Sequence, residues 1–126
     1  MFGCGIGFNL TQVLAANRDQ TIDDLIPYLD LVATAIAADI VPMTGENRVL
    51  AYFGLQVINS DPRPGIKAMT HQLKKKTLDI TDVVFIIAPR INAAGRIKHG
   101  NHAVELLTEF DFEQAQQFAS EIEAYN

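Results

Sequence analysis

The chain has 126 residues, 48% of them hydrophobic, and a formal net charge of −5 at pH 7. This length allows one modest hydrophobic core, and the acidic balance argues against a general nucleic-acid-binding protein. The single cysteine, Cys4, excludes an internal disulfide framework and favours a reducing compartment, so we expect a cytoplasmic protein. No uninterrupted apolar stretch approaches the roughly 18 residues of a membrane span.

The first half of the chain predicts two helices separated by a polar turn. Apolar residues recur with helical spacing over residues 6–16, and residues 25–38 are apolar almost all round, which is typical of a buried helix. Pro27 suits the first turn of this second helix. The helix is expected to end near Asp39, because Pro42 disfavours helix in the residue before it.

The elements that follow are also predicted to be helical. Thr44 is expected to cap a helix that ends near Asn59, and a short helix follows over residues 65–73. Residues 83–87 (VVFII) fit a buried strand by their β-branched content, or a helix capped by the preceding Thr-Asp pair. Pro89 is expected to end this element. Two amphipathic helices complete the chain, the last of them with aromatic residues on its apolar face.

Charge is unevenly distributed along the chain. The basic residues are concentrated in the middle, whereas the segment from Asn101 to the end carries acidic residues without a basic one. The middle is therefore expected to face a polyanion. The members of this central basic group are Arg63, Lys67, Lys74, Lys75, Lys76, Arg90, Arg96 and Lys98. The lysine run 74–76 taken alone is typical of a solvated loop.

Asp39 is the first residue that suggests chemistry. It stands at the end of a long apolar run, where a carboxylate is costly unless it is paired, hydrogen-bonded or bound to a cation. From this pattern alone, a helix-terminal hydrogen-bonding role is more common than a ligand role. Asp30 lies deeper in the same run, and we expect it to be a hydrogen-bonded structural residue. For Arg48 two roles remain open. It either has a functional role, in which it orients Asp39 or binds a phosphate, or it forms a surface salt bridge.

A second segment, residues 89–96 (PRINAAGR), suggests phosphate binding. Two arginines bracket Asn92 and several small residues, which predicts a tight connection where the backbone approaches a ligand closely. We expect Arg96 to contact a phosphate together with Asn92. For Arg90 we expect a structural bridge to a carboxylate or to a helix C-terminus.

Residues 28–48 (YLDLVATAIAADIVPMTGENR) and 89–96, in this order, resemble segments of the RecJ-type exonucleases of the DHH phosphoesterase superfamily. The resemblance covers nearly the whole chain and favours a helix over residues 83–87. The Asp-x-Asp and Asp-His-His motifs of that superfamily do not occur here. The resemblance therefore implies a mainly α fragment of an α/β DHH phosphoesterase domain. Residues 1–100 would be the C-terminal part of the catalytic domain, and residues 101–126 would lead toward the connector and a DHHA1-type domain.

The resemblance also implies a function for the intact enzyme. Such enzymes hydrolyse phosphodiester bonds of single-stranded DNA from the 5′ end, in DNA repair and recombination, with two Mn²⁺ or Mg²⁺ ions. Asp39 matches the aspartate of the fourth metal-binding motif, which makes it the expected catalytic metal ligand. Arg96, Asn92 and Arg48 are expected to hold the nucleic-acid phosphate. The fragment alone is expected to bind no metal and to be inactive, because the main metal motifs are missing.

Two other functions remain open. One is a DHH phosphoesterase that acts on short oligonucleotides, cyclic dinucleotides or pyrophosphate, and the other is a non-enzymatic helical binding or assembly module in which Asp39 is structural. Single-strand-binding protein or a helicase are candidate partners of the exonuclease, and a membrane is not. The apolar face of the last helix predicts homodimerisation of the fragment. The aromatic residues are expected in the core, which leaves no stacking platform for bases.

Overall fold

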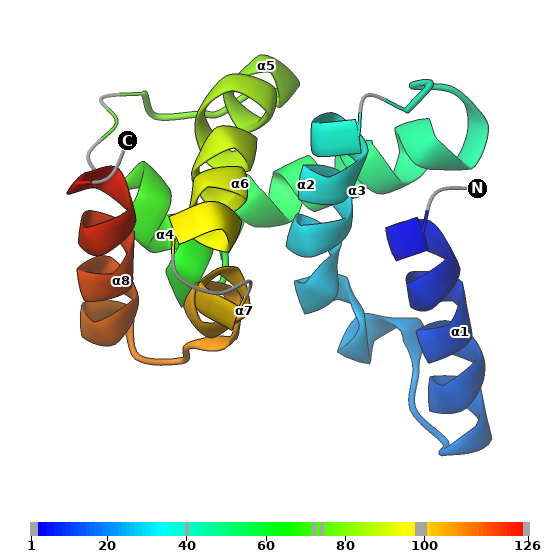
Figure 1. Ribbon diagram of the computed structural model, residues 1–126. Helices are drawn as coiled ribbons and strands as arrows, with labels where there is room; N and C mark the ends of the chain where they lie inside the picture. Colours follow the sequence, from blue (N-terminus) through cyan, green and yellow to red (C-terminus); the bar gives the residue numbers. More distant parts are fainter. Residues whose placement is uncertain (1–2, 40, 72, 74, 98–100, 125–126) are drawn as a thin grey trace.

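The computed structural model describes residues 3–39, 41–71, 73, 75–97 and 101–124, and these form helices without a β-strand (Figure 1). The mainly α fold expected from the sequence is thus confirmed. In the described part of the chain, no helix is long and apolar enough to cross a membrane. The elements are α1 (Gly3–Asn17), the 3₁₀ turns η1 (Ile22–Asp24) and η2 (Ile26–Tyr28), α2 (Leu29–Asp39), α3 (Gly45–Ser60), α4 (Pro64–Thr70), α5 (Ile80–Asp82), the π-helix η3 (Val83–Ile87), α6 (Ala88–Ile97), α7 (Asn101–Thr108) and α8 (Phe112–Ala124).

Helix α2 lies between α1 and α6 (Figure 1) and contributes side chains to two hydrophobic clusters. Its Ala33 and Ala37 face the larger cluster, which α4, η3, α6, α7 and α8 complete. Its Val32 and Ile36 face the smaller cluster against α1 and α3. Because both sides of α2 are buried, its sequence is apolar almost all round.

The helix predicted to begin at residue 25 starts later as an α-helix. Two 3₁₀ turns, η1 and η2, precede α2. Pro27 lies in the first turn of η2, where the N–H that proline lacks would have no acceptor within the helix, so the residue suits this position. The end of α2 at Asp39 agrees with the prediction.

Close packing of α2 on α3 depends on Gly54. Its Cα faces the main chain of Leu29 and the side chain of Ala33, and an added Cβ would collide with both. Helix α3 begins after Thr44 as predicted, although the Thr44 side chain makes no capping hydrogen bond. Val49 and Phe53 are exposed, and the buried residues of α3 are Ala51, Gly54 and Ile58.

Pro89 does not end a helix, contrary to the prediction. Elements α5, η3 and α6 follow one another without a break from Ile80 to Ile97 (Figure 1). A proline removes one backbone donor and crowds the carbonyl four residues earlier. The π-helix just before Pro89, in which Ala88 N–H donates to the Val83 carbonyl, widens the turn and accommodates that loss. The tight connection predicted over residues 91–95 is therefore wrong, and this segment is part of α6.

A capping box starts this continuous helix. Asp79 Oδ1 accepts from the Asp82 N–H at 3.0 Å, and Asp82 Oδ2 accepts from the Asp79 N–H at 2.9 Å. The sequence analysis placed the cap at the Thr-Asp pair 81–82, so the helix was predicted correctly and its first residue slightly late.

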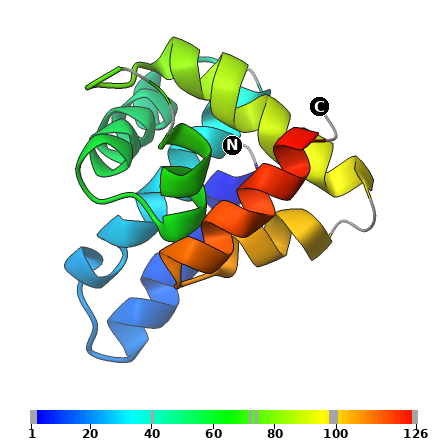
Figure 2. The ribbon, with the colours of Figure 1, turned by 90° about the vertical axis from the view of Figure 1, so that its left-hand side faces the viewer.

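Helix α8 packs against α4 (Figure 2). Its Ala115 and Ile122 are buried, and Phe112 and Phe118 pack on the larger cluster. The apolar face that was expected to be partly exposed is therefore largely covered within the chain. Exposed apolar side chains lie instead on α1 and elsewhere, and self-association stays a prediction.

Candidate metal-ligand and phosphate-binding residues

Asp39 is the last residue of α2 and is exposed to solvent. Its carboxylate has no hydrogen-bond or ion-pair partner among the described residues. Its position beside the start of α1 is evident from Cys4: partial burial raises the pKa of the Cys4 thiol, and the negative charge of Asp39 raises it further. A helix-terminal hydrogen bond of the Asp39 side chain, the structural role considered above, is thus not found among the described residues.

Asp39 can supply one ligand to a metal site, but the described residues around it do not form a complete metal site. Within the described ranges, no three His, Cys, Asp or Glu side chains gather closely enough to hold a metal ion. A single exposed carboxylate supplies one oxygen ligand, whereas Mg²⁺ and Mn²⁺ need several oxygen or nitrogen ligands. Any ion at Asp39 must therefore take its other ligands from elsewhere.

Arg48 lies in the first helical turns of α3 and is exposed. The loop that precedes it is closed by Asn47, whose Nδ2 donates to the Pro42 carbonyl at 3.1 Å. Gly45 begins α3 at a φ of +55°, a left-handed conformation that favours glycine. No surface salt bridge of Arg48 with another described residue is present. The guanidinium is therefore free to meet an anion.

Asn92 and Arg96 both belong to α6 and are four residues apart. Side chains with this spacing lie on the same face of a helix, one turn apart. Both residues are exposed and neither has a side-chain partner within the described part. The two residues therefore lie together on a helix and not on the predicted turn, and their joint contact with a phosphate stays a prediction.

The structure does not gather all four predicted site residues into one cluster. No hydrogen bond or ion pair joins Asp39, Arg48, Asn92 and Arg96, as far as the described residues show. In Figure 1, the end of α6 lies beside α7, whereas the end of α2 with Asp39 lies near the start of α1.

Arg90 has the structural role that the sequence analysis expected. Its Nη2 lies 2.8 Å from Glu123 Oε1 in α8, and its Nη1 donates to the Ile86 carbonyl at 3.0 Å. These contacts tie α6 to α8. The two arginines of the PRINAAGR segment thus differ, because Arg90 is bonded within the fold and Arg96 is exposed.

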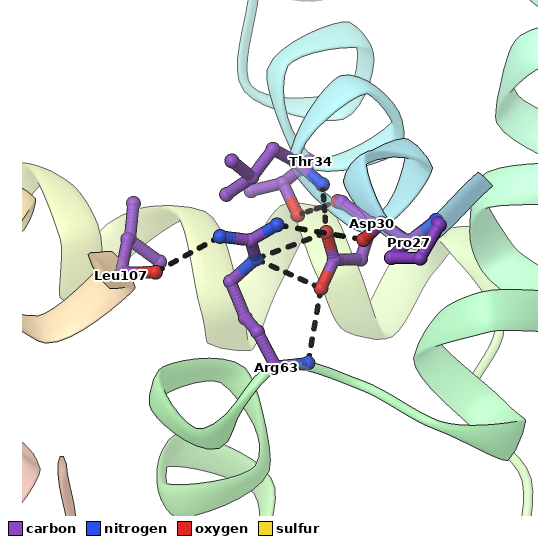
Figure 3. Close-up of polar contacts among 6 residues, drawn as sticks. Pro27, Asp30, Thr34, Arg63 and Leu107 are labelled. Carbon is purple, nitrogen blue, oxygen red and sulfur yellow. Dashed lines mark hydrogen bonds and ion pairs between the residues drawn. The ribbon is translucent and has the colours of Figure 1, made fainter. Parts of the chain in front are cut away.

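Asp30 is fully buried and pairs with Arg63, as Figure 3 shows. Its oxygens accept from Arg63 Nε at 3.0 Å, from the Arg63 N–H at 3.1 Å and from the Leu31 N–H at 2.7 Å. The structural reading of Asp30 is confirmed. The partner of Asp30 was not predicted from the sequence, although a buried carboxylate commonly pairs with a cation and Arg63 stands between two prolines at the start of a predicted helix.

The central basic group is partly used within the fold. Arg63 is bonded to Asp30, Lys75 Nζ lies 3.0 Å from Asp82 Oδ2, and Lys67 lies over the Phe112 ring. The Lys74 and Lys98 side chains lie outside the described residues. Of the described members of the group, Lys76 and Arg96 are exposed cations without a partner in the described part of the chain.

The expectation that aromatic side chains are core residues is wrong for five of the eight aromatic residues that the structure describes. Phe85 is 72% exposed, and Tyr52 and Phe53 form an edge-to-face pair on the surface of α3. The other exposed aromatic residues are Tyr28 and Phe110. Helical spacing does not distinguish a buried aromatic face from an exposed one, so the sequence pattern carried no signal for this difference.

Comparison with known proteins shows what the chain is similar to. It is 36% identical to the single-stranded-DNA-specific exonuclease RecJ of Dickeya dadantii, over 98% of this chain and 24% of that protein. It is 34% identical to RecJ of Escherichia coli over the same shares, and 36% identical to RecJ of Bacillus subtilis over 98% of this chain and 15% of that protein. The chain is similar to RecJ over nearly its whole length. No family model matches the sequence.

Solved structures of RecJ have the same fold over this region. The structure of RecJ from Thermus thermophilus in complex with Mg²⁺ superposes with a TM-score of 0.88 at 32% identity, covering 98% of this chain and 20% of that one. A structure of exonuclease RecJ bound to manganese gives 0.87 at 31% identity, with 98% and 31% covered. The chain thus spans about a quarter of the length of the Dickeya and Escherichia relatives.

Proposed function

We propose that this chain is part of a metal-dependent exonuclease that degrades single-stranded DNA from the 5′ end, in DNA repair and recombination. The observation that carries the proposal is its match, over 98% of its length, to RecJ structures solved with Mg²⁺ and Mn²⁺. The exposed Asp39 carboxylate, which has no partner within the described ranges, supports it.

In this proposal, Asp39 supplies one carboxylate to a metal cluster whose other ligands lie outside the described residues. When bound, Mn²⁺ or Mg²⁺ activates water and neutralises charge that develops on the phosphate. Arg96 and Asn92, on one face of α6, bind the nucleic-acid phosphate, and Arg48 at the start of α3 provides a further cation. Burial is not required for these phosphate contacts, since exposed arginines already face the solvent from which the substrate arrives.

The 126-residue chain alone is expected to be inactive, because a lone carboxylate does not assemble a two-metal site. Single-strand-binding protein or a helicase as partner, and a cytoplasmic location, remain parts of the proposal that rest on the resemblance and on the cysteine content.

The decisive experiment measures Mn²⁺-dependent degradation of 5′-phosphorylated single-stranded DNA by a RecJ-type parent that contains this segment. It compares the parent, its Asp39→Asn variant, the control variant Asp23→Asn and the isolated 126-residue chain. We expect Asp39→Asn to be folded, inactive and weakened in Mn²⁺ binding by calorimetry, and Asp23→Asn to be unchanged, because Asp23 is an exposed residue of η1.

Full activity of the Asp39→Asn parent would remove Asp39 from the metal site and favour the binding-module function. Activity of the isolated chain would show that its own residues suffice. A length series of substrates separates the exonuclease from a phosphoesterase of short oligonucleotides or cyclic dinucleotides, which would prefer the shortest members.

A further inference from the structure

A cleft of about 610 Å³ lies where the 3₁₀ turns η1 and η2, the connection from α3 to α4 and the loop from α7 to α8 meet. Its volume is in the range of ligand-binding clefts in general. The floor is the Arg63 side chain, held by Asp30, by the Leu107 carbonyl at 3.0 Å and by the Pro27 carbonyl at 3.4 Å (Figure 3). These contacts link the three segments, so the cleft is held in shape without a ligand.

The walls of the cleft are aromatic and proline side chains. Tyr28 in η2 is 51% exposed, and Phe110 in the α7–α8 loop is 93% exposed. Pro62 and Pro64 also line the cleft, and their rings restrict the backbone there. A phenylalanine with almost its whole side chain in water is unfavourable by the hydrophobic effect, and such exposed aromatic groups commonly anchor a binding partner.

Acidic residues form the rim. Asp24, Asp61 and Glu109 line the cleft, and its one basic lining residue, Arg63, is 16% exposed and paired with Asp30. The accessible charge of the cleft is therefore negative. Negative charge beside aromatic faces suits a guanidinium or ammonium group, which pairs with carboxylates and stacks on aromatic rings.

We propose that this cleft binds an extended basic peptide segment of a partner protein, with arginine next to proline or leucine. Grooves walled by aromatic and proline residues accept extended or polyproline chains, and the acidic rim selects the basic ones. The cleft is separate from the proposed metal ligand, since Tyr28 precedes the first residue of α2 and Asp39 is its last. Binding here is therefore independent of whether the nuclease assignment holds.

Fluorescence anisotropy with the 126-residue chain tests the proposal. The probe is a fluorescein-labelled peptide composed of repeated Arg-Pro-Leu, and the comparison peptide carries Glu in place of each Arg. The test variants are Asp61→Asn with Glu109→Gln, and Phe110→Ala. The matched controls are Glu46→Gln with Glu121→Gln, which remove two exposed charges elsewhere, and Phe85→Ala, which removes an exposed aromatic ring elsewhere.

We expect saturable binding of the arginine peptide only, weakened about tenfold or more by each test variant and by less than about twofold by each control. Circular dichroism verifies that every variant keeps its helix content. Glu109→Gln keeps an acceptor for the Asp111 N–H, which Glu109 Oε1 now bonds at 3.1 Å, so the loop is expected to be retained. Absence of binding, equal binding of both peptides, equal losses in the control variants, or competition by spermidine as effective as by the unlabelled peptide would each overturn the proposal.

Discussion

Arg63 Nε lies 3.0 Å from Oδ2 of Asp30, and the aspartate side chain is 0% exposed. The two residues are 33 positions apart in the sequence, so this pair joins the start of α2 to the start of α4. The remaining guanidinium donors reach the carbonyls of Leu107 and Pro27. The pair therefore holds three segments of the chain in one arrangement.

Removing one partner of this pair is expected to be severe. Arg63→Ala leaves a buried carboxylate without its cation, and we expect the free energy of unfolding to fall by about 3–5 kcal/mol. The control Arg96→Ala removes an exposed arginine and is expected to change it by less than about 0.5 kcal/mol. Urea denaturation followed by circular dichroism measures both. Equal, small effects of the two substitutions would show that the ion pair does not stabilise the fold.

Two glycines in helices are expected to respond to alanine with opposite signs. Gly54→Ala places a Cβ against Leu29 and Ala33 and forces α2 and α3 apart, at a cost of about 1–3 kcal/mol. Gly7→Ala in α1 meets no atom within 4 Å and is expected to stabilise by about 0.5–1 kcal/mol. Thermal unfolding of both variants distinguishes the cases, and a stabilised Gly54→Ala variant would contradict the close α2–α3 contact.

Acid is expected to weaken the start of the helix that begins at Ile80. The hydrogen bond from the Asp79 N–H, and then that from Lys75, hold the pKa of Asp82 below its ordinary value of 3.8. The folded state thus binds fewer protons than the unfolded state near this pH, and stability rises with pH. The stabilisation that ionised Asp82 provides is complete at pH values above 3.8. It is lost as the pH falls through the lower pKa that Asp82 has in the folded state.

Asp82→Asn tests this dependence. We expect its Tm to be lower than that of the parent sequence at about pH 6, and the difference to shrink progressively at pH values below 3.8. The control Glu121→Gln, at an exposed position of α8, is expected to differ little from the parent sequence at either pH. A Tm difference for Asp82→Asn that stays constant down to the lowest pH would contradict the assignment.

The phosphate role of Arg96 predicts a specific salt dependence. In a RecJ-type parent, Arg96→Ala is expected to weaken binding of single-stranded DNA of any sequence and to reduce the slope of log K against log salt by about 0.7. Lys76→Ala, at an exposed position outside α6, is expected to leave the slope unchanged. Filter binding at several salt concentrations measures both slopes. An unchanged slope for Arg96→Ala would remove this residue from the phosphate contact.

Local sequence signals located most of the helices. Proline and polar cap residues predicted the end of α2 at Asp39 and the start of α3 after Thr44, because both effects act within a few residues. Pro89 is the informative failure. A proline in a sequence usually indicates the end of a helix, yet here a π-helix just before Pro89 keeps the helix continuous. Packing of η3 and α6 against α2 makes that arrangement favourable.

The residue types of the candidate site followed from the sequence, since Asp39, Asn92 and Arg96 were recognised from their neighbours and from the family resemblance. Their environment did not follow. Arg90 is bonded to Glu123 while Arg96 is exposed, Asp30 is paired with Arg63, and Asp39 has no partner among the residues that the structure describes. These environments depend on residues distant in sequence. Apolar spacing and cap residues act over a turn or two of chain, so they determined the helices. Burial and charge pairing depend on which helices meet, and only the tertiary structure decided those.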